Sequence, residues 1–184
     1  ADVGSGSEGR TRQIAVHWSP PDRASLLDAD AWQTEALPAA ASKMMWMFAL
    51  PLQVDGRHGV DIVAGGKGPD AAIGWLESPA NPRQLADWKW HELRPVGWLM
   101  SLVASDMDGD GDMDVVFSDR KWKRSGAYWL ENPGAGASQG QPWREHVIGG
   151  VGTEAMFLHL ADLDQDGLED ALLAVKPQEI LWLR

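Results

Sequence analysis

The sequence has no cysteine among its 184 residues, so disulfides and thiolate metal sites are excluded. This absence does not by itself fix a cellular compartment. No run of 18 apolar residues occurs, and we therefore expect no membrane-spanning segment. Tyrosine occurs once and phenylalanine three times, whereas tryptophan occurs 11 times. The aromatic content is thus concentrated in one residue type whose positions can be compared along the chain.

Positive charge is also scarce, with 16 Lys and Arg against 27 Asp and Glu, a net charge of −11. Such an acidic chain argues against binding to nucleic acid or to an anionic membrane surface. Part of the acidity lies in Asp-rich loops, where bound cations would neutralise it. A hydrophobic content of 44% and a charged content of 23% are typical of a globular protein, and the length allows one sizeable domain.

The tryptophans recur at nearly constant spacing, which predicts a repeat protein. One set is spaced by 57, 54 and 53 residues and a second set by 56 and 55. We expect these side chains to pack between neighbouring repeats. The first set is Trp18, Trp75, Trp129 and Trp182, and the second is Trp32, Trp88 and Trp143.

The clearest repeat predicts four antiparallel strands, which is the pattern of a propeller blade. Its strands are expected at 100–105, 115–118, 127–130 and 143–148. We therefore predict an all-β fold, a segment of a β-propeller built of four-stranded antiparallel blades with repeats of about 53–57 residues. The expected units are a partial blade at 1–37, complete blades at 43–94 and 97–150, and a partial blade at 153–184.

Both partial blades are expected to supply their second and third strands, so they cannot merge into one blade. At the first of them, Asp2 aligns with the last Asp of the later loops. A closed ring normally needs about four to eight blades. We therefore expect other blades of a larger propeller, or other subunits, to complete the ring, because open edges invite aggregation.

Two loops carry Asp at alternate positions with Gly at the bend. Carboxylates at this spacing can converge on one cation, and Gly allows the backbone to wrap around it. An oxygen-only donor set favours calcium, so we expect two Ca²⁺ sites, although Asp-rich turns also occur for solubility alone. The candidate ligands are Asp106, Asp108, Asp110, Asp112 and Asp114 in one loop and Asp162, Asp164, Asp166, Leu168 and Asp170 in the other.

An EF-hand is the obvious alternative for such loops. It requires Glu at loop position 12 and flanking helices. Position 12 is Phe117 in one loop and Leu173 in the other, and the flanking apolar runs have the length of strands. The pattern therefore favours an ion loop within a β-hairpin.

A third loop, at 53–61, has a degenerate sequence. Gln53, Asp55, Arg57 and Asp61 align with the Asp positions of the other loops. We expect no ion here, with Arg57 either pairing with Asp55 or Asp61 or pointing into solvent. On this interpretation Arg57→Asp would create a third site.

Taken together, these motifs resemble the FG-GAP/VCBS repeat family. They are Asp-x-Asp-Gly-Asp-Gly-x-x-Asp followed by Val-Val, then Tyr-Trp-Leu-Glu-Asn-Pro-Gly and Trp-Arg-Glu-His-Val-Ile, and the resemblance extends from Asp2 to Trp182. The resemblance implies a calcium-binding β-propeller, as in integrin α chains and many bacterial secreted proteins. It also implies that loop position 7 binds through its backbone carbonyl, which suits Leu168 and leaves the Asp112 carboxylate dispensable.

Strand order assigns the ion loops to one face and a set of basic and aromatic residues to the opposite face. Aromatic rings stack on sugars, and Lys or Arg pairs with carboxylate or sulfate. The set therefore suggests an acidic glycan or a protein as partner, unless the basic loops only balance the acidic ones or tie blades together. Its members are Lys67, Trp98, Arg120, Lys121, Trp122, Lys123, Arg124 and Lys176.

The expected function is that of a secreted, calcium-stabilised scaffold for a glycan or protein partner, located extracellularly, on a cell surface or in a periplasm. Weak calcium sites fill only where calcium is millimolar. The alternative is the propeller portion of a carbohydrate-active enzyme, since the family includes polysaccharide lyases and sugar dehydratases. Tyr128, the single tyrosine, is expected in a strand, which weakens a tyrosine-based lyase mechanism. A purely structural module is the third possibility.

Overall fold

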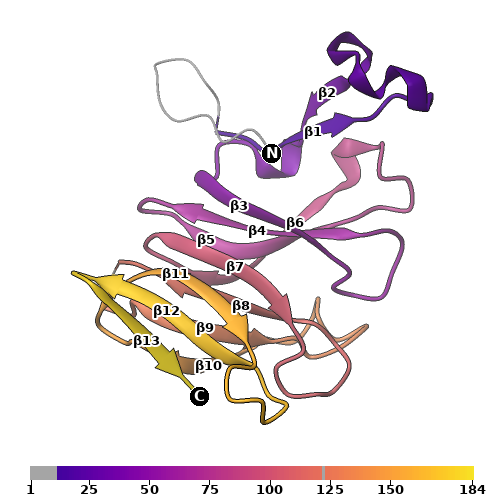
Figure 1. The fold of residues 1–184 in the computed structure, drawn as a ribbon. Coiled ribbons are helices and arrows are strands. Elements are labelled where there is room, and N and C mark those ends of the chain that lie inside the picture. Colours follow the sequence, from indigo (N-terminus) through magenta and orange to yellow (C-terminus); the bar gives the residue numbers. More distant parts are fainter. Residues whose placement is uncertain (1–11, 122) are drawn as a thin grey trace.

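A computed structural model describes residues 12–121 and 123–184, and strands dominate this part of the chain (Figure 1). Two predicted features, Asp2 and Trp122, lie outside the described residues. Within them, no helix has both the length and the apolar character needed to cross a bilayer. The short helices are all 3₁₀ turns: η1 (Arg23–Leu27), η2 (Ala29–Ala31), η3 (Pro38–Ala40) and η4 (Leu85–Asp87).

The strands form antiparallel sheets in which each strand pairs with the next along the chain. Two sheets have four strands, and they confirm the predicted all-β, four-stranded antiparallel organisation. The strands expected in the clearest repeat are each confirmed to within one residue at either end. The first sheet contains β3 (Met45–Leu52), β4 (Asp61–Lys67), β5 (Ala72–Glu77) and β6 (Lys89–Pro95), and the second contains β7 (Leu99–Ser105), β8 (Asp114–Asp119), β9 (Gly126–Glu131) and β10 (Arg144–Gly149).

Smaller sheets flank these two. At the start of the described chain a two-stranded sheet stands above the others in Figure 1, and at the end a three-stranded sheet covers the second four-stranded sheet. The first strands of successive sheets are neighbours, because β3 packs against β7 and β7 packs against β11. The two-stranded sheet is β1 (Ala15–Trp18) with β2 (Gln33–Ala36), and the three-stranded sheet is β11 (Glu154–Ala161), β12 (Asp170–Lys176) and β13 (Glu179–Leu183).

The core lies between the stacked sheets. Every residue of β8 is buried, and β4 is nearly as enclosed, so these strands have apolar side chains on both faces and lack simple alternation. Trp75 and Phe117 are 0% exposed in the first apolar cluster, and Leu173 is 0% exposed in the second. Complete burial of a side chain such as Phe117 stabilises the fold by about 2–3 kcal/mol.

The repeated tryptophans have two distinct packing roles. Trp75 and Trp129 stack on His91 and His146 of the adjacent strand, with ring centroids 4.5 and 4.0 Å apart. Trp182, at the equivalent place in β13, has no fourth strand beside it among the described residues and is 52% exposed. The second set closes the loops before β2, β6 and β10, where indole Nε1 donates to a backbone carbonyl: Trp32 to Leu26, Trp88 to Pro82 and Trp143 to Ser138.

Candidate functional site

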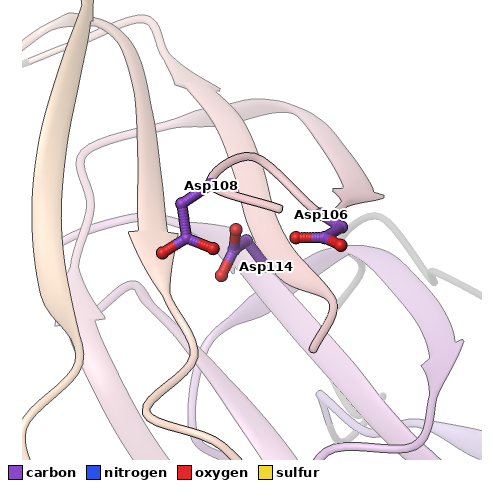
Figure 2. Close-up of side chains that lie close together, drawn as sticks. All are labelled: Asp106, Asp108 and Asp114. Carbon is purple, nitrogen blue, oxygen red and sulfur yellow. The ribbon is translucent and has the colours of Figure 1, made fainter. Parts of the chain in front are cut away.

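The loop between β7 and β8 gathers three carboxylates. Oxygens of Asp106, Asp108 and Asp114 lie within 4.8 Å of one another, and Figure 2 shows the three groups facing a common space. Asp106 accepts hydrogen bonds from Gly109 N at 2.8 Å and Gly111 N at 3.1 Å. Both glycines have positive φ, +78° and +96°, which an L side chain would strain. The loop is therefore wound around its acidic groups.

Asp114 ties this loop to the rest of the sheet. It is 1% exposed and accepts from Met107 N and Asn132 N, both at 2.8 Å. Burial raises the pKa of Asp114 to about 6, against the lowering effect of these two hydrogen bonds, and the carboxylates of Asp108 and Asp110 raise it further. A cation between the carboxylates would oppose the rise, because it favours the ionised form.

The loop between β11 and β12 gathers a second cluster. Oxygens of Asp162, Asp164 and Asp166 lie within 4.8 Å of one another. Both oxygens of Asp164 are buried and have no hydrogen-bond partner among the described residues. The guanidinium of Arg184 forms an ion pair with Asp164 and lies 3.9 Å from Asp166 Oδ2. Because a buried carboxylate is unfavourable unless it is paired with a positive charge, the position of Asp164 beside Arg184 indicates a loop that binds cations.

The structure brings together six of the ten proposed calcium ligands. Asp110 instead accepts from Asp112 N at 2.9 Å, and neither residue is in the first cluster. Asp170 accepts from Leu163 N at 3.0 Å and is 5% exposed, which makes it the counterpart of Asp114 in the second hairpin. Because every gathered donor is a carboxylate oxygen, the two clusters fit a hard divalent cation.

The third loop contains an amide where the others have a charged centre. Gln53 Nε2 donates to the backbone carbonyls of Arg57 at 3.0 Å and Gly59 at 2.7 Å, and its Oε1 accepts from Gly56 N at 3.1 Å. Gly59 occupies loop position 7. A side-chain amide therefore holds the turn closed through neutral hydrogen bonds.

The interpretation that Arg57 pairs with an Asp of its own loop is wrong. No ion pair joins its guanidinium to Asp55 or Asp61 in the part of the chain that the structure describes, and Nη1 contacts Gln139 Oε1 at 3.4 Å. Only the backbone N of Arg57 reaches Asp55, at 2.9 Å. Gln139 also donates to Asp55 Oδ2 at 2.8 Å, so the Asp55 carboxylate links the first sheet to a loop of the second.

Gln53 changes what is needed to restore an ion site in this loop. Arg57→Asp alone leaves the Gln53 amide at the centre of the loop. We therefore expect this loop to bind calcium only in the Gln53→Asp/Arg57→Asp variant, which should hold one more ion per chain than the wild type. Carboxylates at positions 1 and 5 would then join Asp55 and Asp61. Metal analysis after dialysis against calcium measures the change. Gln53→Ala/Arg57→Ala is the matched control, and equal uptake by both variants would contradict this account.

At the other end of β4 and β8, three cations surround one indole ring. Lys67 Nζ, Arg120 Cζ and Lys121 Nζ lie 4.5, 4.7 and 4.8 Å from a ring centroid of Trp98. An open hollow of about 590 Å³ lies beside them. Its lining includes Met45, Lys67, Gly68, Pro69, Gly97, Trp98 and Lys121.

Most of the other predicted members of this face are paired with a carboxylate. Arg120 donates to Glu154 Oε1 at 2.8 and 2.5 Å, and Lys176 lies 3.9 Å from the same oxygen. The hydrogen bond from Arg120 lowers the pKa of Glu154, and the nearby positive charges lower it further. Arg124 forms an ion pair with Glu145 of β10, while Lys123 is exposed.

Sequence reasoning missed the buried charges beneath this face. Asp119 is 1% exposed and accepts from Trp98 N at 2.9 Å and from Gly97 N at 3.1 Å. Arg94 lies 3.6 Å from Asp119 and pairs with Glu145, and burial lowers the pKa of its guanidinium. The one available signal was Asp119 itself, a carboxylate where the other repeats have Gly66 and Val175.

Comparison with known proteins bears on the segment that contains both acidic clusters. Residues 106–173 match the family model described as FG-GAP-like repeat. No curated protein and no solved structure matches the chain. The match begins at the first Asp of one loop and ends in β12, after the second loop. Residues 106–173 are therefore similar to an FG-GAP-like repeat, and this similarity covers both acidic loops.

Proposed function

We propose that this chain is a calcium-stabilised segment of a β-propeller that serves as a scaffold for an acidic glycan or protein partner. One observation carries the proposal. Two clusters of carboxylates lie at one end of the strands, and the basic hollow lies at the other end. The metal would fix the hairpins without occupying the partner face.

The propeller arrangement is supported by how the sheets follow one another. β3, β7 and β11 are neighbours and each begins a sheet, so they would be the inner strands of successive blades. β6 and β10 would then be the outer strands. Other blades or subunits would complete the ring.

The calcium assignment is supported by the donor chemistry of both loops and by the buried oxygens of Asp164, whose one partner among the described residues is a cation, Arg184. Calcium, when bound, would supply the positive charge that balances the gathered carboxylates. Its proposed ligands are Asp106, Asp108 and Asp114 in one loop and Asp162, Asp164 and Asp166 in the other. Because such loops fill where calcium is millimolar, an extracellular, cell-surface or periplasmic setting belongs to the proposal.

The alternative of a carbohydrate-active enzyme has less support. Tyr128 is 2% exposed, its hydroxyl lies 3.4 Å from Ser125 O, and the guanidinium of Arg94 lies 4.6 Å from its ring centroid. Held in this way, the side chain has a packing role and does not reach a bound sugar. A binding scaffold requires no such group.

Calorimetric titration with calcium tests the proposal. We expect two ions per chain, with one site lost in Asp108→Asn and the other in Asp164→Asn. The loop at 162–170 should bind more weakly, because Arg184 repels the ion. Arg184→Ala should therefore strengthen that site at least about fivefold, since two unit charges 4 Å apart interact by about 1 kcal/mol in water and calcium carries two. No uptake at millimolar calcium, or unchanged uptake when both Asp substitutions are combined, would overturn the calcium assignment.

A further inference from the structure

We infer that Lys67 and Lys121, held against Trp98, form a site for the oxyanion group, carboxylate or sulfate, of an acidic sugar unit. The inference rests on the proposed function and names the partner's chemistry at one place on the proposed partner face. Both ammonium groups border the same hollow. Neither has a carboxylate within ion-pair distance in the described part of the chain, so both are available to an anion.

The charge balance around the hollow favours an anionic ligand. Apart from the buried Asp119 carboxylate, which is paired with Arg94, the charged side chains around Trp98 and its neighbour Glu154 are four cations and one carboxylate, a net charge of +3 on a chain whose total is −11. Like charges gathered around one ring repel one another, and an oxyanion between them would relieve the repulsion. The five groups are Lys67, Arg120, Lys121, Lys176 and Glu154.

Trp98 has a different role from the one expected of an aromatic residue on a sugar-binding face. Cations already lie against its ring, so the ring is not an open stacking surface for a sugar. Its electron-rich face instead attracts the ammonium groups and fixes where they stand. Recognition at this site would therefore be ionic.

The backbone beneath these side chains is firmly held. Trp98 pairs with Lys67 through an isolated β-bridge, and its carbonyl accepts from Arg120 N at 2.9 Å. The buried Asp119 fixes Trp98 N at 2.9 Å and Lys121 N at 3.3 Å. Both lysines therefore extend from positions that are ordered before a ligand arrives, which lowers the entropic cost of binding.

The shape of the hollow favours a sugar unit over a protein surface. Its volume of about 590 Å³ lies within the range of about 300–1,000 Å³ that is typical of small-ligand pockets. Met45 and Pro69 add apolar wall beside the two ammonium groups, and the space above Gly68 is open. A uronate ring offers one carboxylate together with apolar C–H faces, which matches both kinds of lining.

The test is titration of the calcium-loaded chain with trigalacturonate, with neutral maltotriose of the same length, and with hexaglutamate. We expect saturable binding of trigalacturonate and none of maltotriose. Lys67→Gln/Lys121→Gln should weaken trigalacturonate binding about tenfold or more, because two charge-assisted contacts are lost. Lys89→Gln, which removes an exposed positive charge at the start of β6 and outside the lining of the hollow, is the matched control and should bind as the wild type does.

Several results would overturn the inference. One is the absence of trigalacturonate binding, and another is equal weakening by Lys89→Gln, which would indicate only general attraction to positive charge. Tighter binding of hexaglutamate than of trigalacturonate would assign the hollow to an acidic protein. If any of these occurs while two calcium ions still bind, the oxyanion site fails and the calcium scaffold stands. Loss of calcium binding itself would instead refute the proposed function.

Discussion

Removal of calcium is expected to lower the melting temperature of this chain by about 10–20 °C. If free calcium is present at about 100 times the dissociation constant of each loop, each bound ion stabilises the fold by about 2.7 kcal/mol. For a chain of this length, 1 kcal/mol corresponds to about 2–4 °C. The effect is expected to be large because neither acidic cluster has enough positive charge of its own. In the first loop Asp106, Asp108 and Asp114 face one another, and the pKa of Asp114 is already raised by burial.

Thermal unfolding in calcium and in the calcium-selective chelator EGTA measures this effect. Asp108→Asn/Asp164→Asn is the matched control, because Asn retains the shape and the hydrogen-bond acceptor of Asp but removes the charge. Its melting temperature should not respond to EGTA. Magnesium should not restore the wild-type value, since it demands octahedral geometry and gives up water reluctantly. A wild-type melting temperature that is the same in calcium and in EGTA would refute calcium stabilisation.

The strands could be predicted from the sequence because their signals are local. The Asp loop and the Glu-Asn-Pro sequence at which β9 ends each report on a few neighbouring residues, and the spacing of Trp75 and Trp129 aligns the repeats. The Asp clusters could be anticipated for the same reason, since alternate residues of one tight loop must lie close together. The structure adds which Asp residues take which role. Asp114 and Asp170 are buried and hold the hairpins, while Asp110 and Asp112 remain outside the first cluster.

Contacts between segments far apart in sequence could not be predicted in this way. The ring of Trp98 meets cations from two other loops, and no spacing rule places Lys67 beside Lys121. Arg184 reaches Asp164 because β13 runs beside β12. Gln53 is a related case, because the sequence shows that a carboxylate is missing from the loop but not that an amide closes the turn.

The second large effect concerns Arg94, which joins the first two sheets. Arg94→Leu is expected to lower the free energy of unfolding by about 3–5 kcal/mol, because removal of one member of a buried charge network leaves the others uncompensated. The side chain of Arg94 is 6% exposed, and it neutralises Asp119 at 3.6 Å and Glu145 in an ion pair. Its guanidinium also lies 4.8 Å from the ring centroid of Phe117, so the substitution loses packing contacts as well as charge.

Denaturant unfolding in calcium measures the loss, and two further variants identify its cause. Lys89→Leu removes a cation from the same strand, but its side chain is 69% exposed and 3.8 Å from Glu77, so we expect a change of no more than about 1 kcal/mol. Adding Asp119→Asn to Arg94→Leu removes the buried charge that is left without a cation, since Glu145 still pairs with Arg124, and should recover part of the stability. If Arg94→Leu costs no more than Lys89→Leu, the buried network does not hold the sheets together. If the cost is large but Asp119→Asn recovers none of it, lost packing is the cause and charge is not.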